Sequence, residues 1–125
     1  MADNDYAAKG AAIQQQLWGE RVSQGTPTAP FAAIAPDYPG LVRESCFGMF
    51  WSRPGLAVRD RSLITCALLA ALGRHDELRG HLAGALNVGL SKEELVEALM
   101  HVGVYAGVPS AVSALNTAAS VLGAS

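Results

Sequence analysis

Charged side chains are scarce in this sequence of 125 residues: Asp, Glu, Lys and Arg make up 16% of it, whereas 50% is hydrophobic. Its nine basic residues are dispersed and the net charge is −2, which argues against a nucleic-acid-binding surface. A small domain with so few charges has apolar surface to cover. We therefore expect a homo-oligomer in which subunits cover that surface for one another.

Long hydrophobic runs and paired cysteines are also lacking. The longest apolar run, residues 66–72, is far shorter than the roughly 20 residues of a membrane span. Residues 1–5 are acidic and precede no apolar segment, which argues against a secretory signal. Cys46 and Cys66 are too few for a disulfide scaffold, and each lies among apolar helix residues, so we interpret them as buried structural thiols. These features favour a cytoplasmic protein with no membrane partner.

Residue types that commonly bind cofactors or metals are few in this sequence. Lys9 and Lys92, the two lysines, lie in polar stretches, which argues against a buried Schiff-base lysine. The histidines His75, His81 and His101 do not form a metal-ligand motif, and no glycine-rich phosphate loop follows a strand. We expect no metal and no cofactor.

Apolar residues recur at helical spacing through nearly the whole chain, without sustained period-two alternation. The pattern predicts an all-α, compact single-domain bundle of about six helices over residues 1–125. We expect an N-terminal helix in residues 1–25, a proline-rich connector in 26–40 and core helices in 41–123. The expected helices cover residues 4–23, 38–52, 57–72, 75–88, 91–106 and 109–122.

Two of these helices have apolar stripes that we expect to face the core. The stripes are Leu41, Val42, Cys46, Met49 and Phe50 in the second helix, and Leu63, Ile64, Ala67, Leu68, Ala71 and Leu72 in the third. The helix over residues 91–106 begins with a capping box, Ser91 and Glu94, and is apolar on nearly every side. Such a helix is either central to the monomer or held between subunits.

The helix over residues 75–88 has a candidate acid–base pair. Glu77 and His81 are four residues apart and share a face that borders Leu78 and Leu82. A hydrogen bond from one ring nitrogen to Glu77 would orient the other nitrogen and raise its proton affinity, as general acid–base catalysis requires. The alternative is a histidine at the edge of the core, held by an ordinary intrahelical pair.

The other two histidines have plainer interpretations. His101 lies one turn after Glu97 and one turn before Tyr105 in an apolar helix, so we interpret it as structural, with a hydrogen bond across an interface as one possibility. His75, at a helix start, is interpreted as a solvated terminal residue.

Arginines bracket the third and fourth helices. Guanidinium groups bind carboxylates through two parallel hydrogen bonds, so several near one cavity would suit a small acid with two or three carboxylates. The alternative is that they are surface charges or subunit salt bridges. The arginines in question are Arg53, Arg59, Arg61, Arg74 and Arg79.

Several separated motifs, in order and with fixed spacing, resemble the gamma-carboxymuconolactone decarboxylase family. They include residues 51–56 (WSRPGL), 61–65 (RSLIT), 69–74 (LAALGR), 77–82 (ELRGHL), 84–87 (GALN), 91–95 (SKEEL) and 105–109 (YAGVP), and the similarity covers about residues 6–122. The resemblance implies an all-helical fold of the alkylhydroperoxidase-D-like type, assembled as a homotrimer or homohexamer.

The resemblance also implies an activity. Relatives in aromatic catabolism are carboxy-lyases that convert 4-carboxymuconolactone into an enol-lactone and CO₂ without a cofactor. By position, His81 would be the proton-transfer group, Glu77 would orient it, and Arg53, Arg61 and Arg79 would hold substrate carboxylates. Redox relatives have a Cys-x-x-Cys pair where this chain has Arg74 and Glu77, so we do not expect a peroxidase.

One segment departs from the family pattern. Where the family commonly has Gly-Glu-x-Trp, this chain has Gly48-Met49-Phe50-Trp51, and Met49 can neither accept nor donate a proton. We expect Met49 and Trp51 to contact the substrate. The departure leaves two alternatives: a tailoring enzyme of secondary metabolism that decarboxylates, isomerises or cyclises a larger apolar substrate, or a non-catalytic ligand-binding oligomer.

Overall fold

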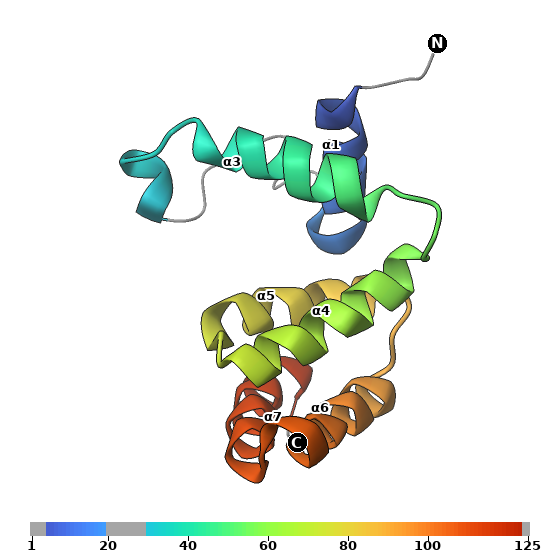
Figure 1. Ribbon diagram of the computed structural model, residues 1–125, viewed down its shortest axis with the longest axis vertical. Helices are drawn as coiled ribbons and strands as arrows, with labels where there is room; N and C mark the ends of the chain where they lie inside the picture. The colour runs from blue at the N-terminus through green and yellow to red at the C-terminus, as the bar shows by residue number, and fades with distance from the viewer. Residues whose placement is uncertain (1–4, 20–29, 124–125) are drawn as a thin grey trace. The chain divides into compact units, whose positions relative to one another are not determined.

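The computed structural model describes residues 5–19 and 30–123, and in these residues it is all-α, as predicted (Figure 1). The elements are α1 (Tyr6–Trp18), the 3₁₀ turn η1 (Pro30–Ala33), α3 (Tyr38–Val42), the π-helical η2 (Arg43–Trp51), α4 (Val58–Leu72), α5 (His75–Asn87), α6 (Lys92–Ala106) and α7 (Val108–Leu122). The parts of the predicted first helix and connector that fall on residues 4 and 20–29 lie outside the described residues. None of the described helices is long and apolar enough to cross a membrane.

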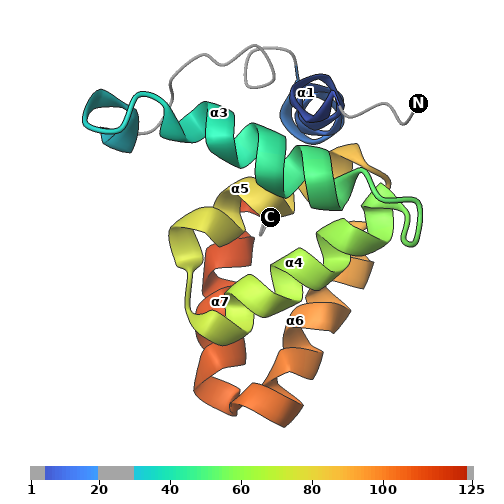
Figure 2. The ribbon, with the colours of Figure 1, turned by 45° about the horizontal axis from the view of Figure 1, so that its top comes forward.

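The chain divides into two units, residues 1–58 and 59–125. The first unit is built on the crossing of α1 with η2, which Figure 2 shows looking along α1. Glycines let the two backbones touch: a Cβ on Gly10 would overlap the carbonyl oxygen of Arg43, and a Cβ on Gly48 would overlap that of Tyr6. Beside this contact, the Arg43 Nε donates to the Oε1 of the buried Gln14 at 2.7 Å.

The helix predicted over residues 38–52 is confirmed as α3 and η2 together, but its buried face is not the predicted one. Phe47, Gly48 and Trp51 are buried. The Phe47 ring lies 5.6 Å from that of Trp18 in α1 and 5.5 Å from that of Trp51. From the predicted stripe, Leu41, Cys46, Met49 and Phe50 are exposed. The expectation of a buried Cys46 is therefore wrong, because Gly48 and the aromatic residues determine which face α1 contacts and because the π-helical turn shifts the α-helical register.

The second unit contains α4, α5, α6 and α7 around one hydrophobic core (Figure 1). Gly73, which has φ 73°, links α4 to α5, and α7 packs against both α5 and α6. Proline in the first turn of α7 was predicted and is confirmed. The buried core residues are Cys66, Ala70, Leu78, Leu82, Ala85, Leu90, Leu95, Leu99, Val102, Ala114 and Ala118.

Helix α4 turns its small residues inward. Ser62, Cys66 and Ala70 are its buried residues, so the prediction of a buried Cys66 is confirmed. The large members of the predicted stripe are exposed: 45% for Ile64, 55% for Leu68 and 69% for Leu72. Leu63 and Ala67 of this stripe pack against the core, but the expectation is wrong for Ile64, Leu68 and Leu72, because α4 buries its small residues and leaves this part of its apolar face uncovered.

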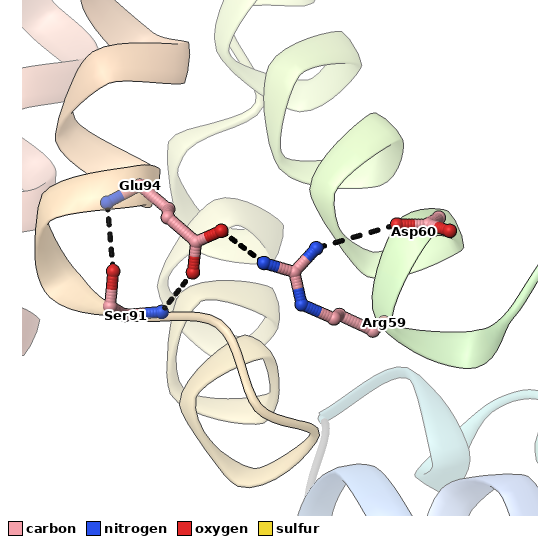
Figure 3. A network of polar contacts seen from close by, with 4 residues as sticks. All are labelled: Arg59, Asp60, Ser91 and Glu94. Atoms are coloured by element: carbon pink, nitrogen blue, oxygen red, sulfur yellow. Dashed lines mark hydrogen bonds and ion pairs between the residues drawn. The ribbon is translucent and has the colours of Figure 1, made fainter.

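The capping box predicted at the start of α6 is confirmed. The Glu94 N–H donates to the Ser91 hydroxyl, and the Ser91 N–H donates to Oε1 of Glu94, each at 3.0 Å. The other Glu94 oxygen accepts a hydrogen bond from Arg59 in the first turn of α4, and Arg59 also reaches Asp60 at 3.4 Å (Figure 3). The Ser91 amide and then Arg59 hold the pKa of Glu94 below its usual range. This network ties the start of α4 to the start of α6.

Candidate active site

Helix α5 places the predicted pair at the edge of the core. It begins at His75 and has Asp76 and Glu77 in its first turn, where acidic side chains favour the positive end of the helix dipole. Glu77 is exposed, whereas His81, one turn later, is half-buried beside the fully buried Leu82. The structure thus confirms the position predicted for His81, at the border between core and surface.

The charge state of His81 differs from the expectation. Burial lowers the pKa of His81 from 6.5 to about 4, and the nearby Glu77 carboxylate raises it by a smaller amount. The expectation of a raised proton affinity is wrong, because removing the imidazolium from water costs more than one partly solvated carboxylate returns. His81 is therefore neutral at pH 7 in the free protein. A bound anion beside the ring would raise the pKa of His81 again.

The predicted arginines occupy three different settings. Arg61 is half-buried on α4, in the same unit as His81, and its backbone carbonyl accepts from the Thr65 hydroxyl at 2.8 Å. Arg79 is exposed and forms an ion pair with Asp76 at 2.8 Å. Because Arg79 is two residues from His81, its side chain lies about 160° around the helix axis from that of His81 and faces away from it. Arg53 follows η2 in the other unit and is exposed.

The remaining predicted site residues, Met49 and Trp51, also belong to the first unit. Met49 is 45% exposed on the outer face of η2. Trp51 is 8% exposed, and its ring packs against Phe47, which gives it a packing role in its own unit. That these two residues contact the substrate stays a prediction.

The thiols of the described residues are unsuited to redox chemistry. Cys66 is fully buried, and burial raises the pKa of its thiol to about 12. Cys46 is exposed as a residue, yet partial burial of its sulfur raises the pKa of the thiol, and a hydrogen bond with Trp51 lowers it in part. A reactive thiolate needs the opposite shift. Across residues 5–19 and 30–123, no group of three His, Cys, Asp or Glu side chains is arranged to hold a metal ion.

His75 is more enclosed than the sequence suggested. It is half-buried, and its Nδ1 lies 3.3 Å from the hydroxyl of Thr117 in α7. It lines a hollow of about 340 Å³ with Ser110 and Ser113. The interpretation of a solvated terminal residue is wrong, because α7 packs against the start of α5, a tertiary contact with no local signal.

A larger hollow that the sequence analysis did not identify lies between α4 and α6. It measures about 1010 Å³, and apolar residues make most of its lining, with His101 and Tyr105 among the exceptions. Neither His81 nor Glu77 lines it. The exposed stripe of α4 and the all-round apolar character of α6 were the signals that could have identified it.

The sequence is similar to known proteins over most of its length. Residues 36–120 match the Carboxymuconolactone decarboxylase family. The chain is 45% identical to a 4-carboxymuconolactone decarboxylase of Acinetobacter baylyi over 97% of its length and 90% of the relative. It is 40% identical to the nitrosuccinic acid decarboxylase of Metarhizium robertsii over 60% of its length and 52% of that protein. An uncharacterised 15.0 kDa protein of Paracoccus denitrificans is 30% identical over 70% of the chain and 67% of the relative. The chain belongs to the carboxymuconolactone decarboxylase family.

Proposed function

We propose that this protein is a cofactor-independent decarboxylase that converts 4-carboxymuconolactone into an enol-lactone and CO₂ in aromatic catabolism. The observation that carries the proposal is the 45% identity, over nearly the full chain, to a relative with that name. Two features support the proposal. His81 lies on α5 at the edge of the hydrophobic core, and the raised pKa values of both cysteines argue against thiol chemistry.

The reaction requires an electron sink and one proton. The bond between the ring carbon and the carboxylate breaks, CO₂ leaves, and the electron pair moves into the conjugated lactone. A proton then adds to carbon. Hydrogen-bond donors directed at the lactone oxygen, where negative charge develops, would lower the barrier.

In this proposal the neutral His81 supplies that proton after substrate binding. The substrate anion raises the pKa of His81, so the imidazole takes up a proton as the complex forms and delivers it to the ring carbon next to the lactone carbonyl, which leaves the double bond of the enol-lactone at the carbon that lost CO₂. Glu77, one turn earlier, orients the ring and stabilises the imidazolium, consistent with its effect on the pKa of His81. Arg61, half-buried on the neighbouring helix, holds a substrate carboxylate. Roles for Arg53 and Arg79 in carboxylate binding stay predictions.

The test is turnover of 4-carboxymuconolactone by the purified protein, measured as the release of CO₂ and enol-lactone. We expect His81→Gln to lower kcat by about 10²–10⁴-fold, the usual contribution of a positioned acid–base group. His75→Gln is the matched control, since this histidine lies on the same helix and contacts Thr117 instead. Activity of His81→Gln within a few-fold of the parent would contradict the proton-transfer role.

Nitrosuccinic acid is the second candidate substrate. The fungal relative named for it is 40% identical over 75 residues, and the chain spans about half of that protein. Met49 stands where the family commonly has an acid, and this departure is a reason to test a substrate other than the usual lactone. Assaying both acids in parallel under the same conditions compares the two substrates directly, through their kcat/KM values.

We further propose that the enzyme is a homotrimer or homohexamer and works in the cytoplasm. The uncovered apolar side chains of α4 and α6 support subunit assembly. The free cysteines, Cys46 and Cys66, are consistent with a reducing compartment.

A further inference from the structure

Four polar side chains form a line along the exposed face of α6. Glu93, Glu97, His101 and Tyr105 are four residues apart, which places them one above the next on an α-helix. All four are exposed, and all four line the hollow between α4 and α6, which we call the α4/α6 groove. The rings of His101 and Tyr105 lie 5.4 Å apart.

The two acids of this line have no cation beside them. Among the ion pairs of the described residues, the neighbouring Glu94 pairs with Arg59, whereas Glu93 and Glu97 take part in none. The groove is otherwise apolar, and its side chains are open to water: Leu68 is 55% exposed and Val104 is 71% exposed. An exposed apolar surface of this kind marks an interaction site, and acids within it need groups of complementary charge on the partner.

The order of the four residues indicates which partner. Acids occupy the first half of the line, and the imidazole and phenol occupy the second half. Suppose that a second α6 lies antiparallel on the exposed face of the first, with the twofold axis midway between Glu97 and His101. Each Glu97 then lies opposite the other copy's imidazole, and each Glu93 opposite the other copy's phenol. A parallel arrangement would instead place acid against acid, which costs energy.

We infer that the α4/α6 groove is a twofold interface with a second copy of this chain, in which Glu97 of each copy pairs with His101 of the other. Such an interface uses the same surface on both subunits. The line on α6 meets this condition, because its acidic half matches its own imidazole and phenol half when a second copy is turned around. Antiparallel α6 helices also align their dipoles favourably. On the homotrimer of the proposed function, a twofold contact of this kind joins two trimers into a hexamer.

Two single substitutions and their mixture test the pairing between copies. In Glu97→Lys the interface would place a cation opposite each imidazole, and in His101→Glu it would place one carboxylate opposite each Glu97. We expect each variant alone to have about half the wild-type mass by light scattering, because the twofold contact is lost. An equimolar mixture of the two variants restores opposite charges across the axis, and we expect it to regain the full mass.

The mixture separates contacts between copies from effects within one helix, because mixing cannot repair a helix that one substitution has weakened. Glu44→Lys, the same charge change on the exposed side of η2, is the matched control and should keep the wild-type mass. Circular dichroism checks that each variant is helical. The inference is overturned if the wild type is a 13.0 kDa monomer or an isolated trimer, if both single variants keep the wild-type mass, or if the mixture stays dissociated.

Discussion

At the scale of single residues, the burial of His81 links the proposed chemistry to stability. The pKa of His81 is about 4 in the folded protein and near 6.5 when the ring is exposed. The unfolded state therefore binds more protons than the folded state between these values. The contribution of His81 to the free energy of unfolding is therefore nearly constant above pH 6.5 and falls as the pH drops towards 4.

We predict that the wild type loses about 2 kcal/mol of unfolding free energy through His81 between pH 7 and pH 4.5. His81→Gln, which has no proton to gain, should lose that much less over the same interval. Urea unfolding at both pH values and one fixed protein concentration measures the difference. Equal losses in the two proteins would show that His81 is not desolvated in the native state.

Local signals gave part of this residue-scale picture in advance. The Ser91–Glu94 capping box and the shared face of Glu77 and His81 depend on spacing within one helix, and both were predictable from the sequence. The sign of the His81 pKa shift was not, because it depends on how much water the tertiary structure removes from the ring. The contact of His75 with Thr117 joins residues far apart in the sequence and gave no local signal.

At the scale of elements, the crossing of α1 and η2 depends on two glycines. We predict that Gly48→Ala destabilises the protein by about 1–3 kcal/mol, because its methyl group would overlap the Tyr6 carbonyl. Gly40→Ala is the matched control: Gly40 lies in α3 with nothing within 4 Å of the added methyl, so the change should be neutral or stabilise by up to about 1 kcal/mol. Chemical denaturation compares the two variants.

Hydrogen exchange locates the effect of that substitution. Loss of protection in Gly48→Ala should be greatest in α1 and η2, the elements whose backbones touch. An unchanged stability and exchange pattern would show that the helices separate at little cost.

Most of the large residues in two predicted apolar stripes lie on exposed faces of η2 and α4, for one reason. A helical period shows that a face is apolar, but it does not show whether the cover comes from the same chain or from another. In α4 the intramolecular core uses Ser62, Cys66 and Ala70, whereas Ile64 and Leu68 remain uncovered. The helices were therefore predictable to within a few residues, while the choice of face depended on tertiary packing.

At the scale of the whole molecule, low charge and uncovered apolar side chains have the same consequence. Only 16% of the residues are charged, and large apolar residues such as Leu72 at 69%, Val104 at 71% and Val108 at 68% are exposed in the isolated chain. Partner subunits that cover these residues bind the folded state and not the unfolded state, so assembly stabilises the fold by mass action.

The thermal midpoint should accordingly depend on protein concentration. We predict that Tm rises by about 2–5 °C for each tenfold increase in wild-type concentration, since tenfold is worth at most 1.4 kcal/mol and the chain is of ordinary domain size. Glu97→Lys should show a smaller rise, because one class of contact is lost, while Glu44→Lys should behave as the wild type. Differential scanning calorimetry over a hundredfold range of concentration measures the slope. A Tm that stays constant over this range would mean that the subunits unfold independently, and that the exposed apolar faces of α4 and α6 contribute nothing to the stability of the protein in solution.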